Sequence, residues 1–173
     1  KGYRLEYDLS PTIEYQERSS NTSVRFSTCY NRKFSSRLSL RTGIILSKLY
    51  FSYDAGSLHD EEEPWEWIED YEGVGDTESY QGYTQFKFKP VSNFTLHAGL
   101  HYLQLALNED FAIEPRGGFK WELPNSQYIT GGFGMHSRHE QLMHYFTKLY
   151  DEDGIEYFPN KDLKLQRSIH YVL

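Results

Sequence analysis

Hydrophobic and polar residues alternate along much of the chain, and the alternation is clearest in the stretch 94–137. In its first part the apolar positions are Phe94, Leu96, Ala98, Leu100 and Tyr102. Residues 113–123 and 128–137 repeat the pattern, after a loop at 108–111 and a tight turn at 124–126. Because successive side chains of a β-strand point to opposite faces, the pattern predicts three antiparallel strands with one apolar and one polar face.

The same period of two recurs outside this stretch and predicts five further strands. Their predicted ranges are 3–15, 23–30, 37–53, 82–89 and 166–173. The connections alternate in length, with short turns at 31–33 and 90–93 and longer predicted loops at 16–22, 54–80 and 139–163. We therefore expect an all-β fold, an antiparallel up-and-down meander of about eight strands with tight turns at one end and long loops at the other. The last of these loops is predicted to contain a short surface helix.

The composition fits strands that have an apolar outer face. Aromatic residues make up 17% of the chain, with 15 Tyr and 11 Phe, although the mean hydropathy is only −0.70. Outer-membrane β-barrels combine a polar interior with girdles of aromatic side chains around an apolar band. A single cysteine, Cys29, excludes an intramolecular disulfide. No apolar run approaches the roughly 18 residues of a membrane-spanning helix.

The distribution of charged residues along the predicted strands bears on the choice between a barrel and a soluble β-sandwich. Alternation by itself fits either architecture. Arg, Lys and Glu recur on one face of strand after strand, which favours a barrel whose charged faces line a lumen. The opposite faces would then contact lipid, and they carry Leu38, Leu40, Phe86, Phe94, Leu96, Phe119 and Phe133.

An acidic stretch separates the third and fourth predicted strands. Between Leu49 and Phe86 the chain has no Lys or Arg but holds 11 of its 25 acidic residues. We predict a long solvated loop at 54–80, whose aromatic residues include Trp65, Trp67 and Tyr71. Trp and Tyr stack on sugars or planar groups, and carboxylates bind hydroxyls or cations, so the loop is a candidate ligand contact. The alternative is a solvated loop that only keeps the surface anionic. Its charge argues against nucleic acid as a partner.

Three polar-face residues of the stretch 94–137 are further candidates for ligand contact: Glu114, Arg116 and His136. Glu114 and Arg116 lie near the loop end, and the alternative interpretation is a cross-strand salt bridge. His97 and His101 share a face, but about 13 Å of strand separates them, too far for one metal ion. We predict no metal, no cofactor and no catalytic residue, because nothing places two carboxylates of the acidic stretch at a catalytic separation. An enzyme is the least favoured class.

Several segments, in this order and spacing, resemble the barrel of the TonB-dependent outer-membrane receptors of the Bacteroidetes group. The similarity covers about residues 20–173. The segments are Tyr30–Arg37 leading into Leu40–Ile44, then Leu96–Tyr102, Ile113–Arg116, Phe133–Ser137, and Pro159–Leu163 preceding Ser168–Leu173.

This resemblance implies a barrel of 22 strands in the bacterial outer membrane. A plug domain would fill the barrel, and the TonB protein would deliver energy for the import of a nutrient ligand such as a siderophore, vitamin, glycan or peptide. On this interpretation the chain is an internal portion of the barrel without the plug. Its partners are the lipid bilayer, the plug, TonB and the unknown ligand. The alternative is a small independent β-barrel or β-sandwich binding module that uses the acidic aromatic loop.

Overall fold

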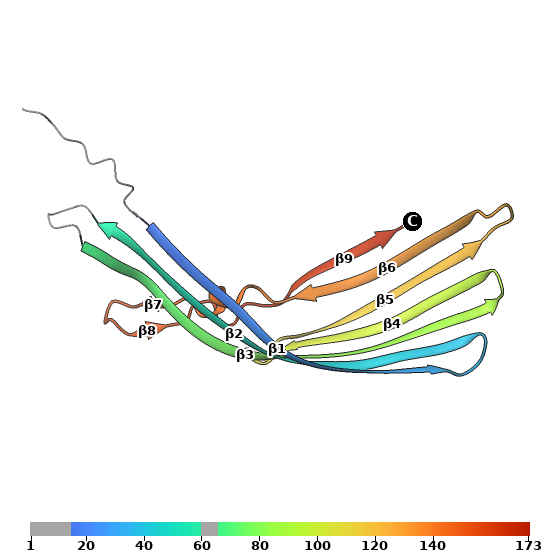
Figure 1. Cartoon of the computed structure of the whole chain (residues 1–173), viewed down its shortest axis with the longest axis horizontal. Helices are drawn as coiled ribbons and strands as arrows, with labels where there is room; N and C mark the ends of the chain where they lie inside the picture. The colour runs from blue at the N-terminus through green and yellow to red at the C-terminus, as the bar shows by residue number, and fades with distance from the viewer. Residues whose placement is uncertain (1–14, 60–65) are drawn as a thin grey trace, which may run out of the picture.

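A computed structural model describes residues 15–59 and 66–173, and most of these residues lie in β-strands. In this part of the chain seven strands form one antiparallel sheet in the order β1-β2-β3-β4-β5-β6-β9 (Figure 1). They are β1 Tyr15–Lys33, β2 Leu38–His59, β3 Glu66–Val91, β4 Phe94–Leu105, β5 Phe111–Glu122, β6 Tyr128–Arg138 and β9 Gln166–Val172. Between β6 and β9 the chain forms the short helix α1 (Leu142–Tyr145) and a two-stranded hairpin of β7 (Leu149–Tyr150) and β8 (Glu156–Tyr157). The all-β antiparallel meander predicted from the sequence is confirmed.

The strand register sorts the side chains into an apolar face and a polar face. On the apolar face Leu38 of β2 pairs with Phe88 of β3, Phe88 with Leu96 of β4, and Leu96 with Phe119 of β5. The alternate positions form the polar face, where Tyr83 of β3 pairs with His101 of β4 and His101 pairs with Glu114 of β5. Paired residues share a face because the pleat is common to adjacent strands. The two-faced pattern predicted for residues 94–137 is therefore present.

The predicted asymmetry in the length of the connections is present only in part. The turns at 34–37, 92–93 and 123–127 are short and lie together at one end of the sheet, on the right of Figure 1. At the other end the segment 139–165 between β6 and β9 is long, whereas the connection 106–110 between β4 and β5 is as short as the turn at 123–127. The predicted loop at 16–22 was wrong, because β1 continues through it in register with residues 50–56 of β2. Most of the predicted strand 3–15 lies outside the described residues.

The acidic stretch also contains more strand than predicted. Residues 54–59 continue β2 and residues 66–80 belong to β3, so the predicted loop 54–80 becomes a long hairpin. Pairing between β2 and β3 satisfies the hydrogen bonds of the backbone amides irrespective of side-chain charge. In addition, Lys48 of β2 forms salt bridges with Asp76 and Glu78 of β3. The tip at 60–65 lies outside the described residues.

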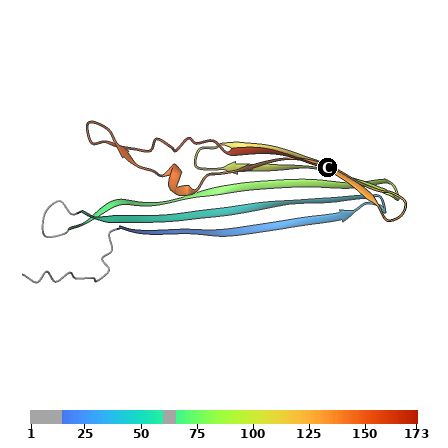
Figure 2. The same ribbon diagram turned by 90° about the horizontal axis from the view of Figure 1, so that it is seen from above.

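The segment 139–165 folds onto the polar face near the loop end and forms the main hydrophobic core. Leu142 and Tyr145 of α1 are 4% and 0% exposed, so the predicted surface helix buries one side against the sheet, while His144 stays exposed. The buried residues of the core are Phe51, Leu103, Leu105, Ala112, Leu142, Tyr145 and Leu165. The segment follows β6, yet its helix α1 contacts β2 and β3 on the far side of the sheet. These contacts are possible because the sheet curves toward its polar face (Figures 1 and 2). No helix of the described residues is long and apolar enough to cross a bilayer.

A glycine on β3 makes room for this core. The rings of Phe51 and Phe146 lie 5.1 Å apart between centroids, directly over Gly75. A Cβ atom at Gly75 would come within 2.7 Å of the first ring and 2.8 Å of the second. Any side chain at this position would displace aromatic rings that attach segment 139–165 to the sheet.

Candidate functional site

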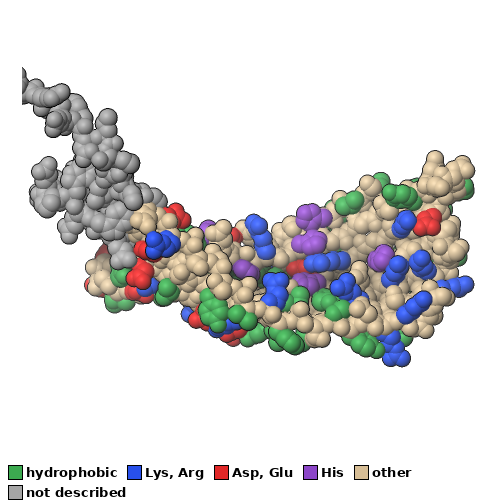
Figure 3. All heavy atoms as spheres, in the orientation of Figure 1, with side chains coloured by type: hydrophobic (Ala, Val, Ile, Leu, Met, Phe, Trp, Pro, Cys, Tyr) green, Lys and Arg blue, Asp and Glu red, His purple; other side chains and the backbone are tan. Residues whose placement is uncertain are grey.

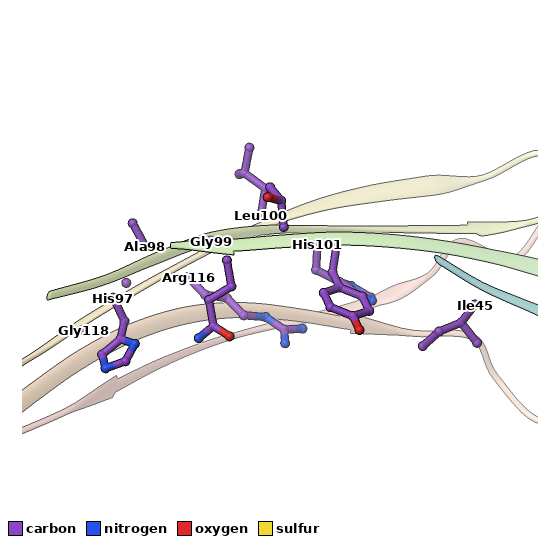
Figure 4. Close-up of a pocket in the computed structure, with 12 residues that line it drawn as sticks. Ile45, His97, Ala98, Gly99, Leu100, His101, Arg116 and Gly118 are labelled. Carbon is purple, nitrogen blue, oxygen red and sulfur yellow. The ribbon is translucent and has the colours of Figure 1, made fainter. Parts of the chain in front are cut away.

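A hollow on the polar face is the candidate site. Its volume is about 360 Å³. Gly99, Gly117 and Gly118 form part of its floor. Since glycine has no side chain, the backbone is uncovered at these positions. Figure 4 shows His97 and Arg116 on one side of the sheet and Ala98 and Leu100 on the other. In Figure 3 His and Lys or Arg side chains gather along the middle of this face.

Glu114 anchors the site from beneath and is only 1% exposed. Its Oε2 atom lies 2.9 Å from His101 Nδ1 and accepts a hydrogen bond of 2.5 Å from Arg116. Its Oε1 atom accepts a hydrogen bond of 2.7 Å from the backbone N–H of Ser137 on β6. His101 Nε2 in turn lies 3.2 Å from the side-chain oxygen of Gln81 on β3. The network therefore joins four adjacent strands through one buried carboxylate.

The register of β4 and β5 places these groups together. Glu114 is directly opposite His101, while Arg116 follows two positions later on the same face. Glu114 forms its salt bridge with Arg116 within β5, and its cross-strand partner is His101. Arg116 keeps 43% of its side chain exposed, so its guanidinium group is held by Glu114 and still faces the hollow.

A second hollow of about 450 Å³ adjoins the first and shares Gln85 and His97 with it. The polar-face side chains that line it include the basic residues Lys33, Arg41 and Lys87. The described residues provide no acidic side chain to the lining of either hollow. The two hollows together form a continuous basic surface in the middle of the polar face.

Among the other predicted site residues, His136 is not one of those that line the hollow. His136 lies on the polar face of β6, where its ring makes an edge contact with His170 of β9 at 5.1 Å between centroids. Trp65 lies outside the described residues. The backbones of Trp67 and Tyr71 belong to β3 and pair with Leu58 and Ala55. From Tyr71 the strand needs 12 residues to reach the hollow, a distance of about 40 Å.

Several residues of the site were not among the candidates taken from the sequence. Gln81, Tyr83, Gln85 and Lys87 all stand on the polar face of β3 and line the site or bind its network. Their alternation with apolar residues was a usable signal, but the pairing partner of each residue is not encoded locally. The described residues contain no group of three His, Cys, Asp or Glu side chains placed to hold a metal ion.

The segment 139–165 is fastened to the β4–β5 connection near its C-terminal end, and an internal hydrogen bond stabilises its N-terminal part. Near its C-terminal end, Asp110 accepts a hydrogen bond of 2.7 Å from the backbone N–H of Leu165, and Asn108 donates one of 2.7 Å to the carbonyl of Leu163. Near its N-terminal end, the hydroxyl of Tyr145 accepts a hydrogen bond of 3.2 Å from the backbone N–H of Glu140. Burial raises the pKa of the Tyr145 phenol above its ordinary value.

Comparisons of the chain with protein-family models, curated proteins and solved structures found no match.

Proposed function

We propose that the chain forms part of the wall of a transmembrane β-barrel in a bacterial outer membrane, within a nutrient receptor of the TonB-dependent type. The observation that carries the proposal is an apolar face that no described residue covers on any strand of the sheet. The receptor type rests on the resemblance of the short sequence segments between residues 20 and 173.

The apolar face exposes large side chains that a water-soluble sheet would bury. Phe26 is 63% exposed, Leu100 51% and Ile113 58%, and Ile44, Leu46, Phe86, Phe88, Leu96, Trp121 and Ile129 are each between 38% and 46% exposed. Water-soluble monomers seldom expose contiguous apolar patches larger than a few hundred Å². Each Å² left in water forgoes about 25 cal/mol, so lipid is the solvent that suits this face.

The dimensions of the apolar face suit a bilayer. On β2 the apolar positions run from Leu38 to Leu46, a span of nine residues, and a tilted transmembrane strand needs about 9–11 residues to cross a bilayer. Aromatic side chains stand at both ends of this span. Those at the turn end are Phe88, Phe94, Phe119 and Trp121, and those at the loop end are Tyr50, Tyr80, Tyr102 and Phe111.

The strand count favours a barrel larger than the sheet described. With seven strands in an antiparallel meander, β1 and β9 run in the same direction. The two edge strands β1 and β9 are therefore unable to pair with each other as antiparallel neighbours. In a second copy with the same orientation, β1 would also run parallel to β9 of the first copy. Closure by antiparallel pairing therefore requires further strands. In the proposed barrel the polar face lines the lumen, next to the plug, and the acidic β2–β3 hairpin with Trp67 and Tyr71 extends toward the ligand.

The alternative of a β-sandwich binding module requires a second sheet over the apolar face. Among the described residues the second sheet is the hairpin of β7 and β8, with two residues in each strand. It is too small to bury a face seven strands wide.

Site-directed spin labelling in lipid vesicles tests the membrane proposal. Cys29, an exposed free thiol, is first replaced by Ser. Phe86→Cys and Gln85→Cys then place a nitroxide on adjacent residues of β3 that point to opposite faces. We expect the label at 86 to be accessible to dissolved oxygen and shielded from a water-soluble nickel chelate, because it faces lipid. The label at 85 serves as the matched control and should show the reverse preference.

Accessibility of both labels to the nickel chelate alone would contradict a lipid-facing surface. Immobilisation of the label at 86, with no access for either reagent, would indicate a dry core and support the β-sandwich. The receptor assignment has its own test: it predicts that the parent gene encodes a plug domain upstream and more strands downstream, and a gene without them would refute it.

A further inference from the structure

We propose that the two adjoining hollows of the polar face bind a small, multiply charged oxyanion, a solute that carries phosphate or carboxylate groups. This inference depends on the polar face being open to solvent at the two hollows.

The shape of the site fits a small ligand. Pockets for small molecules commonly enclose 300–1,000 Å³, and the hollow around Arg116 measures about 360 Å³. A Cβ atom at Gly99 would lie 2.9 Å from the carbonyl oxygen of Thr84, so this part of the floor has no room for a side chain. The glycine floor leaves depth in which an anion is partly removed from bulk water, and its interaction with nearby cations is strengthened there.

The charge of the face is predominantly positive. Over the described strands its basic side chains are Arg25, Lys33, Arg41, Lys87, Lys89, Arg116, Lys120 and Arg138, and its acidic ones along the same strands are Glu17, Glu114 and Glu122. Glu114 is already engaged by Arg116 and Glu122 by Lys120. A concave surface lined by one sign of charge attracts counter-ions of the opposite sign.

Arg116 is preorganised as the central donor. Arginine has five N–H donors in a planar fork that matches carboxylate and phosphate oxygens. Glu114 takes up part of this fork from beneath the surface, while 43% of the Arg116 side chain remains exposed. The buried carboxylate thus holds the guanidinium group in place, and the donors that it leaves free face the hollow. Glu114 acts here as a positioning residue.

Lys87 and His97 are the other side chains of the proposed anion site. Lys87 is exposed on the rim of the adjoining hollow, and within the described residues it has no acidic partner for its ammonium group. His97 lines both hollows, which places it between Lys87 and Arg116 along the wall of the site. An anion with two charged groups would therefore reach Arg116 with one group and the Lys87 side with the other.

Isothermal titration calorimetry of the parent protein in zwitterionic detergent micelles tests the proposal, with sodium pyrophosphate and sodium citrate as probes. We expect both anions to bind at 50 mM salt and to bind more weakly at 200 mM, because the attraction is screened. Lys87→Gln should weaken the binding at least tenfold. Lys120→Gln, a matched control on the same face but outside both hollows, should change the affinity less than twofold. Circular dichroism checks that each variant keeps its strand content.

The relative response to the two probes identifies the preferred group. A stronger response to pyrophosphate indicates phosphate, and a stronger response to citrate indicates carboxylate. Three results would overturn the proposal: no binding of either anion, equal weakening by both lysine substitutions, or binding of polyglutamate without binding of the small anions. The last result would assign the face to an acidic polypeptide.

Discussion

Removal of the Glu114 carboxylate is the sharpest test of the network that joins β3, β4, β5 and β6. In the variant Glu114→Ala, three groups lose their acceptor: the side chains of His101 and Arg116 and the backbone N–H of Ser137. The backbone N–H belongs to β6, so the substitution also removes a tie between two neighbouring strands.

The magnitude follows from the exposure of each partner. Breaking a buried ion pair by removing one member costs about 3–5 kcal/mol. Arg116 is 43% exposed and regains water when Glu114 is lost, so its share of that cost is small. His101 is only 16% exposed, and an unpaired buried polar group costs about 1–3 kcal/mol. We therefore expect Glu114→Ala to lower the free energy of unfolding by about 3 kcal/mol and the near-isosteric Glu114→Gln by about half as much.

Reversible urea unfolding in detergent or lipid, followed by tryptophan fluorescence, measures this free energy. The control is Glu122→Gln, on the same strand and the same face, where the salt bridge with Lys120 leaves the two side chains 56% and 44% exposed. An exposed pair contributes about 0–1 kcal/mol, so this variant should remain close to the parent protein. Equal losses for Glu114→Ala and Glu122→Gln would refute the assignment of the buried network as a stabilising element.

The remaining predictions concern the segment 139–165. Gly75→Val should destabilise the fold by about 1–3 kcal/mol and increase hydrogen exchange in the segment, because the new side chain displaces two aromatic rings. Gly82→Ala, where a Cβ atom meets nothing within 4 Å, is the control, and matching exchange in both variants would contradict the packing argument. Asp110→Ala should increase proteolysis near residues 163–165, since the backbone N–H there loses its acceptor; unchanged cleavage would show that this bond does not hold the segment. Because the pKa of Tyr145 is raised from 10.0, its neutral phenol contributes stability that is complete below pH 10 and is lost as the pH rises through the higher folded value. Urea unfolding at pH 8 and at pH 11.5 should therefore show a smaller loss of stability for Tyr145→Phe than for the parent, and equal losses would exclude Tyr145 as the cause.

The two-faced strands could be predicted from local sequence because side-chain direction depends only on position along a strand. Phe94, Leu96 and Leu100 are on the apolar face for this reason, and Glu114 and Arg116 are on the polar face. The short turns between strands were also visible, since they interrupt the period of two. The sequence by itself therefore determined the fold class, the meander and the composition of each face.

Tertiary structure decided what depends on partners distant in the chain. Residues 16–22 and much of 54–80 are polar enough to be taken for loops, yet they are strands because a neighbouring strand satisfies their backbone hydrogen bonds. Leu142, Tyr145 and Leu165 of the segment 139–165 are buried because the segment folds back over the curved sheet, where α1 contacts β2 and β3. The candidate site has the same origin, since only the register of β3, β4 and β5 places His101 opposite Glu114 and aligns the glycines of its floor. Register is a non-local property, and a shift of one residue would move every one of these side chains to the other face.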